Sequence, residues 1–161
     1  VESVSSSWAL APEIGTFLSD DLQLGLALGI TGSKQTFDGD DVFKSTSIDP
    51  TIYGRKFFSV TDNFSLFTGL YLSFISETDT DYVPTTVEFK TSGFGGRVGV
   101  GVAYALSPRF TAVGQYGLLG FESTKTKVDG DETSSNTSFD FGVNTIGASV
   151  FNIGIYYTFK Q

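Results

Sequence analysis

The chain has 161 residues, enough for one domain of ordinary size, and we expect residues 1–161 to form a single domain. Its 18 acidic and 10 basic residues give a net charge of −8, which argues against a nucleic-acid partner. The sequence has no Cys and no His, so disulfide scaffolds, thiolate nucleophiles, Ser-His-Asp hydrolases and the commonest metal sites are excluded. We also expect no cofactor.

Hydrophobic residues recur with a period of two along the chain. The clearest stretch, Leu22–Ile30, has Leu or Ile at every even position and Gln, Gly or Ala at every odd one. A helix would spread these leucines around its circumference, whereas a strand places them on one face. The same alternation predicts seven strands, over residues 4–18, 22–33, 46–60, 64–76, 86–106, 110–123 and 138–160.

Two kinds of connection alternate between these strands. Residues 19–21, 61–63 and 107–109 carry turn chemistry between large apolar residues, which predicts tight turns. The other connections are polar and acidic, and they predict long loops over residues 33–46, 76–90 and 122–137. Short turns therefore alternate with long loops.

The less hydrophobic face of the strands distinguishes two all-β folds. In a water-soluble barrel that face meets solvent and carries a charged side chain every few residues. Here it carries mostly Gly, Ala, Ser, Thr and Gln, a few aromatic residues and isolated charges. These residues suit the narrow interior of a small barrel whose large apolar face meets lipid. We therefore predict an all-β, antiparallel up-and-down transmembrane β-barrel of the eight-strand type, with a Phe-rich β-sandwich as the alternative.

Aromatic residues gather at the two ends of the predicted strands, as the two girdles of a membrane barrel do. The set near the short turns and the C-terminus is Phe57, Phe58, Phe64, Tyr157 and Phe159. The set near the long loops is Phe74, Phe89, Phe94, Phe139 and Phe141.

Five stretches resemble the small outer-membrane β-barrel proteins of Bacteroidetes, relatives in architecture of the OmpA/OmpX barrels. They are Ala11–Phe17, Asp21–Gly29, Thr61–Phe67, Ala103–Phe110 and Asn152–Phe159. The resemblance implies an integral protein of the bacterial outer membrane, in contact with lipid and lipopolysaccharide. The terminal aromatic pattern also resembles the signal that the barrel-assembly machinery reads on a last strand. The family carries no known catalytic set, so the resemblance implies no enzymatic activity.

Four charged residues, Glu13, Asp49, Arg55 and Arg97, lie on the less hydrophobic face of the strands. Glu13 and Arg55 each stand a similar distance before a tight turn, so we expect them at similar heights. The arrangement favours a closed interior salt-bridge network, because side chains fill an eight-strand barrel and pairing offsets the cost of burying charge. An ion-selective constriction is the alternative.

The acidic segments Asp38–Asp41 and Asp129–Glu132 look like fragments of calcium-binding loops. Neither has the twelve-residue ligand pattern of such a loop, and Asp-Gly favours a hairpin turn. We expect turns at both, with loose divalent bridging to lipopolysaccharide phosphates as the alternative.

These observations favour a structural or surface-interaction role in the outer membrane, or an accessory role in an outer-membrane protein complex. The alternative is a channel or porin for small solutes, although the predicted interior is crowded by Phe17, Tyr53, Phe67, Tyr71 and Tyr156. An enzyme is a third hypothesis, disfavoured because no pair of carboxylates stands out on one face.

The number of predicted strands raises a topological problem. Seven alternating strands make the first and the last run in the same direction, whereas membrane barrels of this type have an even number of antiparallel strands. We therefore predict that an additional strand, antiparallel to residues 4–18, is absent from this chain. Pro12 and Pro50 fall inside predicted strands, where each removes a ladder hydrogen bond, so we expect bulges there or an open edge beside the first strand.

Overall fold

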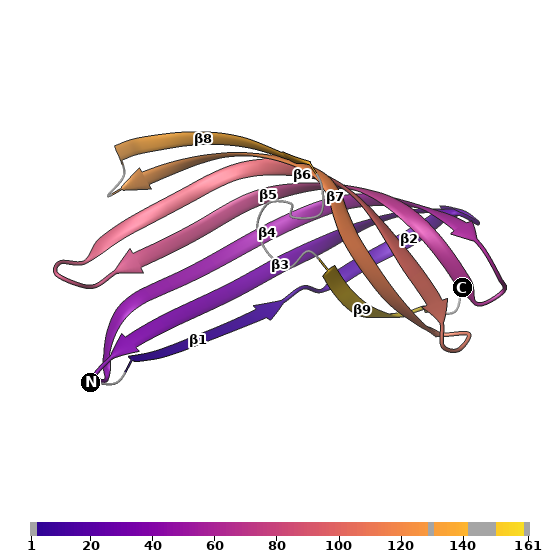
Figure 1. Cartoon of the computed structure of the whole chain (residues 1–161), viewed down its shortest axis with the longest axis horizontal. Helices are drawn as coiled ribbons and strands as arrows, with labels where there is room; N and C mark the ends of the chain where they lie inside the picture. Colours follow the sequence, from indigo (N-terminus) through magenta and orange to yellow (C-terminus); the bar gives the residue numbers. More distant parts are fainter. Residues whose placement is uncertain (1–2, 129–130, 142–150, 160–161) are drawn as a thin grey trace.

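The computed structural model describes residues 3–128, 131–141 and 151–159, and all regular structure in these ranges is β (Figure 1). The strands are β1 (Ser3–Leu10), β2 (Glu13–Ser19), β3 (Leu22–Phe37), β4 (Asp40–Ser59), β5 (Phe64–Asp81), β6 (Val87–Ala105), β7 (Phe110–Val128), β8 (Asp131–Phe141) and β9 (Phe151–Tyr157). No helix in the described ranges is long and apolar enough to cross a membrane.

The strands form one antiparallel sheet in up-and-down order. The hydrogen-bonded path is β1-β3-β4-β5-β6-β7-β8, with β2 also paired to β3 and β9 also paired to β7. β1 pairs with residues 30–37 of β3 and β2 with residues 22–27, so together they form one interrupted edge strand. β8 and β9 do the same along β7, and residues 142–150 between them lie outside the described ranges. The predicted all-β, antiparallel, up-and-down arrangement is confirmed.

The predicted long loops are wrong, because most of their residues extend the strands. β3 and β4 continue to a two-residue turn at Asp38 and Gly39, whose φ angles are 49° and 95°, as an Asp-Gly hairpin turn requires. β5 and β6 continue until residues 82–86. Polar side chains occupy both faces there, so the backbone pairing continues where the hydrophobic alternation has ended. The predicted turn at Asp129-Gly130 lies outside the described residues.

The two prolines are accommodated without bulges. Pro12 falls in the interruption between β1 and β2, at the edge of the sheet, where its carbonyl accepts a hydrogen bond of 2.9 Å from the Leu28 amide. Pro50 lies inside β4, and the pairing with β5 stops at Ile48–Ser76 and resumes at Thr51–Ser73 in the same register. The expected bulge at Pro50 is wrong, because two unpaired positions suffice to accommodate the missing amide.

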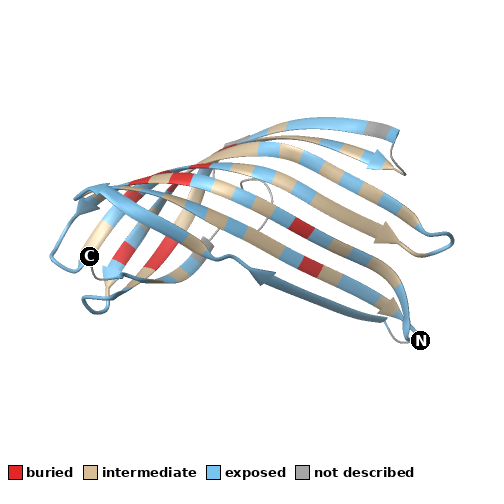
Figure 2. Ribbon diagram, turned by 180° about the vertical axis from the view of Figure 1, so that it is seen from behind, coloured by how far each residue is buried: buried red, intermediate tan, exposed pale blue. Residues whose placement is uncertain are grey.

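The sheet is curved, and buried or intermediate residues alternate with exposed residues along its central strands (Figure 2). Its two faces differ in chemistry. Large apolar side chains stand exposed on the convex face, among them Leu24 at 43%, Leu26 at 56% and Leu70 at 55% relative exposure. The intervening residues, such as Gly25, Ala27 and Gly29, face the concave side. We define the apolar band as the convex face from Leu22 to Ile30 on β3, from Ile48 to Phe58 on β4 and from Phe64 to Phe74 on β5.

Most aromatic residues of the two predicted girdles lie on the convex face. Phe110, Tyr157 and Phe159 stack edge to face near the short turns, with ring centroids 5.2 and 5.1 Å apart. Phe94 and Phe121 pack at 6.1 Å at the other end. Two assignments are wrong: Phe57 packs against Phe67 on the concave side, and Phe89 lies in a concave row, because each is one residue out of phase with the convex rows. The side chain of Phe141 is not described.

The two edges of the sheet run in the same direction. β1, β2, β8 and β9 all run from the long-hairpin end, at residues 38–39 and 82–86, to the short-turn end, at residues 20–21, 60–63 and 106–109. Residues 3–19 pair with β3 as predicted, and in the described ranges no backbone pairing joins β1 or β2 to β8 or β9. Closure of the sheet into a barrel is not shown.

Candidate functional site

The side chain of Arg55 is the centre of the concave face. It is only 2% exposed, and its guanidinium is satisfied from several strands. Nε donates to the Tyr71 hydroxyl at 3.0 Å, one terminal nitrogen donates to the Tyr156 hydroxyl at 3.0 Å, and the other forms an ion pair with Glu13 at 2.9 Å. The same terminal nitrogen lies 3.3 Å from Oε1 of Gln115. Burial of this charge is offset by both pairing and hydrogen bonding.

The Arg55 network joins the two edges of the sheet. Glu13 lies on β2 and Tyr156 on β9, and the Tyr156 hydroxyl donates to the Glu13 carboxylate. Both side chains also bind Arg55 on β4. The edges therefore meet through side chains inside the concavity, although their backbones are not paired.

Aromatic rings surround the guanidinium and fill the concavity toward the short turns. Arg55 lies 4.1 Å from the centroid of the Tyr53 ring, a cation–π distance. Phe67 packs on Phe57 at 5.2 Å between centroids, and Phe57 packs on Phe17 at 5.5 Å. Tyr53 and Phe67 are each 2% exposed. This half of the concave face is a packed core.

Glycines make room for these rings. A Cβ atom on Gly25 would clash with the Tyr53 ring, and one on Gly101 would clash with the Phe67 ring. Gly25 and Gly101 therefore have a packing role, since each lies under an aromatic ring from a neighbouring strand.

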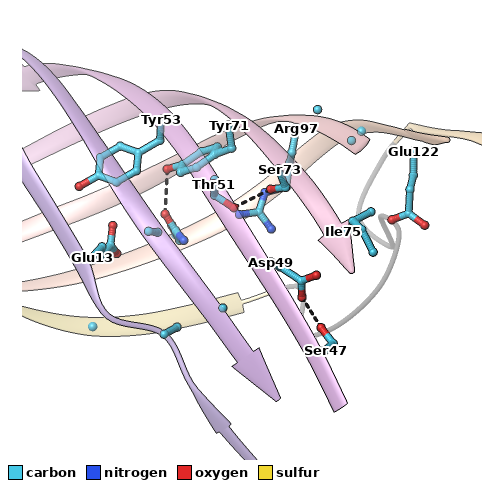
Figure 3. A pocket seen from close by; sticks show the side chains of 18 of the residues that line it. Glu13, Ser47, Asp49, Thr51, Tyr53, Tyr71, Ser73, Ile75, Arg97 and Glu122 are labelled. Carbon is cyan, nitrogen blue, oxygen red and sulfur yellow. Dashed lines mark hydrogen bonds between the residues drawn. The ribbon is translucent and has the colours of Figure 1, made fainter. Parts of the chain in front are cut away.

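Toward the long-hairpin end the concave face opens into a cavity of about 670 Å³ (Figure 3). Its polar lining includes Ser47, Asp49, Glu77, Arg97 and Glu122. Ser47 donates to Asp49 at 2.6 Å, while the other carboxylate oxygen of Asp49 is buried without a hydrogen bond.

Acidic side chains dominate this cavity. Burial raises the pKa of the Glu77 carboxyl above its usual value, and the nearby charges of Asp79, Asp49 and Glu122 act in the same direction. Ser45 opposes them by donating to Glu77 at 3.2 Å. Glu77 lies beyond the apolar band, directly opposite Ser47 of β4. The negative charges around this cavity therefore disfavour the binding of anions.

The chemistry available on this face is limited. In the part of the chain that the structure describes, no group of three or more Asp and Glu side chains could hold a metal ion. Glu13, the carboxylate nearest the centre, is already engaged by Arg55 and Tyr156. A fixed and saturated network of this kind supports structure better than proton transfer.

The four charged residues predicted from the sequence do not form one network. The structure brings Glu13 and Arg55 together, whereas Asp49 binds Ser47 and lies apart from them. The Arg97 guanidinium stacks on the Tyr71 ring at 4.9 Å, so Tyr71 is its link to Arg55. Sequence reasoning missed the hydrogen-bonding roles of Tyr71, Tyr156 and Gln115, although their positions on the less hydrophobic face carried the signal.

Comparison with protein-family models, with curated proteins and with solved structures finds no match for this chain.

Proposed function

We propose that this chain is an integral β-barrel protein of the bacterial outer membrane, without enzymatic activity. Its role is structural, or it presents the long hairpins to a surface partner or to other subunits of an outer-membrane protein complex. Its surroundings are outer-membrane lipid and lipopolysaccharide, and the barrel-assembly machinery inserts it.

The observation that carries the proposal is the exposed apolar band. From Phe64 to Phe74, β5 advances ten residues, which is about 33 Å along the strand. At the usual tilt of about 40° this corresponds to about 25 Å, the height of the lipid-facing band of a membrane barrel. In water so large an exposed apolar surface would cause aggregation. In lipid, a closed sheet also satisfies every backbone polar group.

The polar hairpins support an orientation in the membrane with the long hairpins on one side and the short turns on the other. Above the apolar band both faces of β3–β6 carry polar side chains, which suits strands that project into water. The short connections and the aromatic residue Phe159 lie at the opposite end, as in barrels whose short turns face the periplasm.

Fractionation of cells that produce the complete protein tests this proposal. We expect the protein in the outer-membrane fraction, resistant to alkaline carbonate and released by detergent. A protein that remains soluble and monodisperse without detergent contradicts the proposal.

A small-solute channel is the second candidate, and the cavity lined by Asp49 and Arg97 is the observation that favours it. Against it stands the packed half of the concave face around Arg55. Reconstituted in a planar lipid bilayer, the protein should give no stable conductance of porin size. A steady and reproducible open channel reverses the ranking of the two functions.

A further inference from the structure

The unpaired edges of the sheet are the feature that neither the fold nor the proposed function explains. β1 and β2 use one side of their backbone to pair with β3, and the opposite side has no strand partner in the described ranges. Every described residue of β1, and all of β2 except Glu13, is exposed. If the chain lies in a membrane as proposed above, the backbone groups of β2, which pairs with residues 22–27 inside the apolar band, need partners, because lipid offers none.

Strand direction defines what can pair there. β1 and β2 run toward the short-turn end, and so do β8 and β9. A second copy inserted in the same orientation offers only edges of that same direction, so it cannot form an antiparallel ladder with either edge. An odd number of alternating strands can close the sheet, because the first and the last of them then run antiparallel to the two edges.

The side chains inside the concavity limit that number to one. Arg55 on β4 touches residues of β2, β5, β7 and β9, and Glu13 touches Tyr156 directly. Only a narrow barrel lets side chains from strands so far apart in the sheet reach one guanidinium, since diameter grows with strand number. Three additional strands would widen the lumen and pull Glu13 away from Tyr156.

We propose that one further β-strand of the same polypeptide, outside residues 1–161, fills the gap between the β1/β2 edge and the β8/β9 edge. It runs antiparallel to both, with apolar side chains facing lipid and small or polar side chains facing the lumen. We assign this strand to the same polypeptide because neighbouring strands of the sheet are consecutive in the sequence and are joined by hairpins. A further hairpin would make the additional strand antiparallel to the edge strand that it follows or precedes. The inference rests on the proposed membrane location, and it identifies the partner of the open edge.

Photo-cross-linking from the open edge tests this proposal. Residues 1–161 contain no Cys, so Ile14→Cys in the complete protein, with any Cys outside these residues replaced by Ser, can carry a single benzophenone-maleimide in its own membrane. Ile14 is 71% exposed and Leu18 is 59% exposed, so Leu18→Cys serves as a second edge position if the first variant folds poorly. The matched control is Leu26→Cys, which lies between Ile14 of β2 and Ile52 of β4 in the sheet.

We expect the control to cross-link to residues of β2 and β4. The Ile14→Cys probe should cross-link to β3 and also to a segment outside residues 1–161. Both cross-links should be intramolecular, so the product keeps the mass of a single polypeptide. Cross-links to β9 would show direct closure, an adduct with another polypeptide would show a strand supplied in trans, and attachment to lipid alone would show an open edge. Each of these results overturns the inference.

Carbonate extraction of the same membranes keeps the two proposals separate. If the protein is not membrane-integral, the proposed function fails whatever the cross-link map shows. If it is integral and Ile14→Cys maps to β9, to another polypeptide or to lipid, the membrane assignment stands and only the inference about the additional strand fails.

Discussion

The short-turn half and the long-hairpin half of the sheet share one hydrogen-bonded ladder but differ in what surrounds it. In the short-turn half the convex face is mostly apolar, with the ion pair between Lys56 and Asp21 near the turn, and the concave face is packed around Arg55. In the long-hairpin half both faces are polar, and charged pairs such as Lys34–Asp41 and Lys90–Glu88 lie in the open. The backbone pairing is the same in both halves, so side-chain chemistry alone distinguishes the half that we propose lies in lipid from the half that we propose lies in water.

Loss of the Arg55 guanidinium should have the largest effect. Arg55→Met leaves Glu13 partly buried beside Tyr156 without its cation, and removing one partner of a buried pair costs about 3–5 kcal/mol. Urea unfolding in lipid vesicles, followed through the single tryptophan Trp8, measures it.

The double variant Arg55→Met/Glu13→Gln is the control for the ion pair. If the pair is coupled, the double variant loses less stability than the sum of the two single variants. Strictly additive losses would mean that the short-turn half gains its stability from the aromatic rings alone.

An arginine on the convex face should distinguish the two halves directly. Leu26→Arg places a charge near the middle of the apolar band and should cost about 2–4 kcal/mol in a bilayer. Thr46→Arg places the same side chain on the same face of the long-hairpin half, where we expect almost no change. Equal losses at the two positions would contradict a lipid boundary between the halves.

Glycine substitutions should have a smaller effect that depends on the ring above each glycine. Gly101→Ala drives a methyl group into the Phe67 ring, and such overpacking typically costs about 1–3 kcal/mol. At Gly29 the nearest atom to a new Cβ would be Cβ of Asp49 at 3.5 Å, an ordinary contact, so Gly29→Ala is the matched control. Comparable losses from both would mean that backbone conformation, and not packing against Phe67, requires these glycines.

Sequence periodicity predicted the strands of the short-turn half and the direction of their side chains, because one face there is consistently apolar. It failed in the long-hairpin half, where polar residues on both faces leave no alternation to detect. It also placed Glu13 and Arg55 on one face, with Asp49 higher along the same face. The contact between Glu13 of β2 and Arg55 of β4 depends on the registers of both strands with β3, which only the paired backbone defines.

The pH dependence of the long-hairpin half should be the smallest effect. The pKa of Glu77 is raised in the folded protein, so its stabilising contribution is complete below the unfolded value near 4.5 and is lost as pH rises through the folded value. Hydrogen exchange in β4 and β5 should therefore slow on acidification toward that range, and Glu77→Gln should weaken the response. Glu88→Gln, at an exposed carboxylate, should leave the response unchanged.

The up-and-down order has a consequence for the folding pathway. Successive segments of the sheet are joined by two to five residues between β2 and β8, so those hairpins form with little loop-closure entropy. The contact between Glu13 and Tyr156, 143 residues apart, has a larger loop-closure cost than the contact between Arg55 and Tyr156, 101 residues apart. We expect the contact between Glu13 and Tyr156 to form after the rate-limiting barrier, so that substitutions at Glu13 or Tyr156 accelerate unfolding and leave the folding rate almost unchanged.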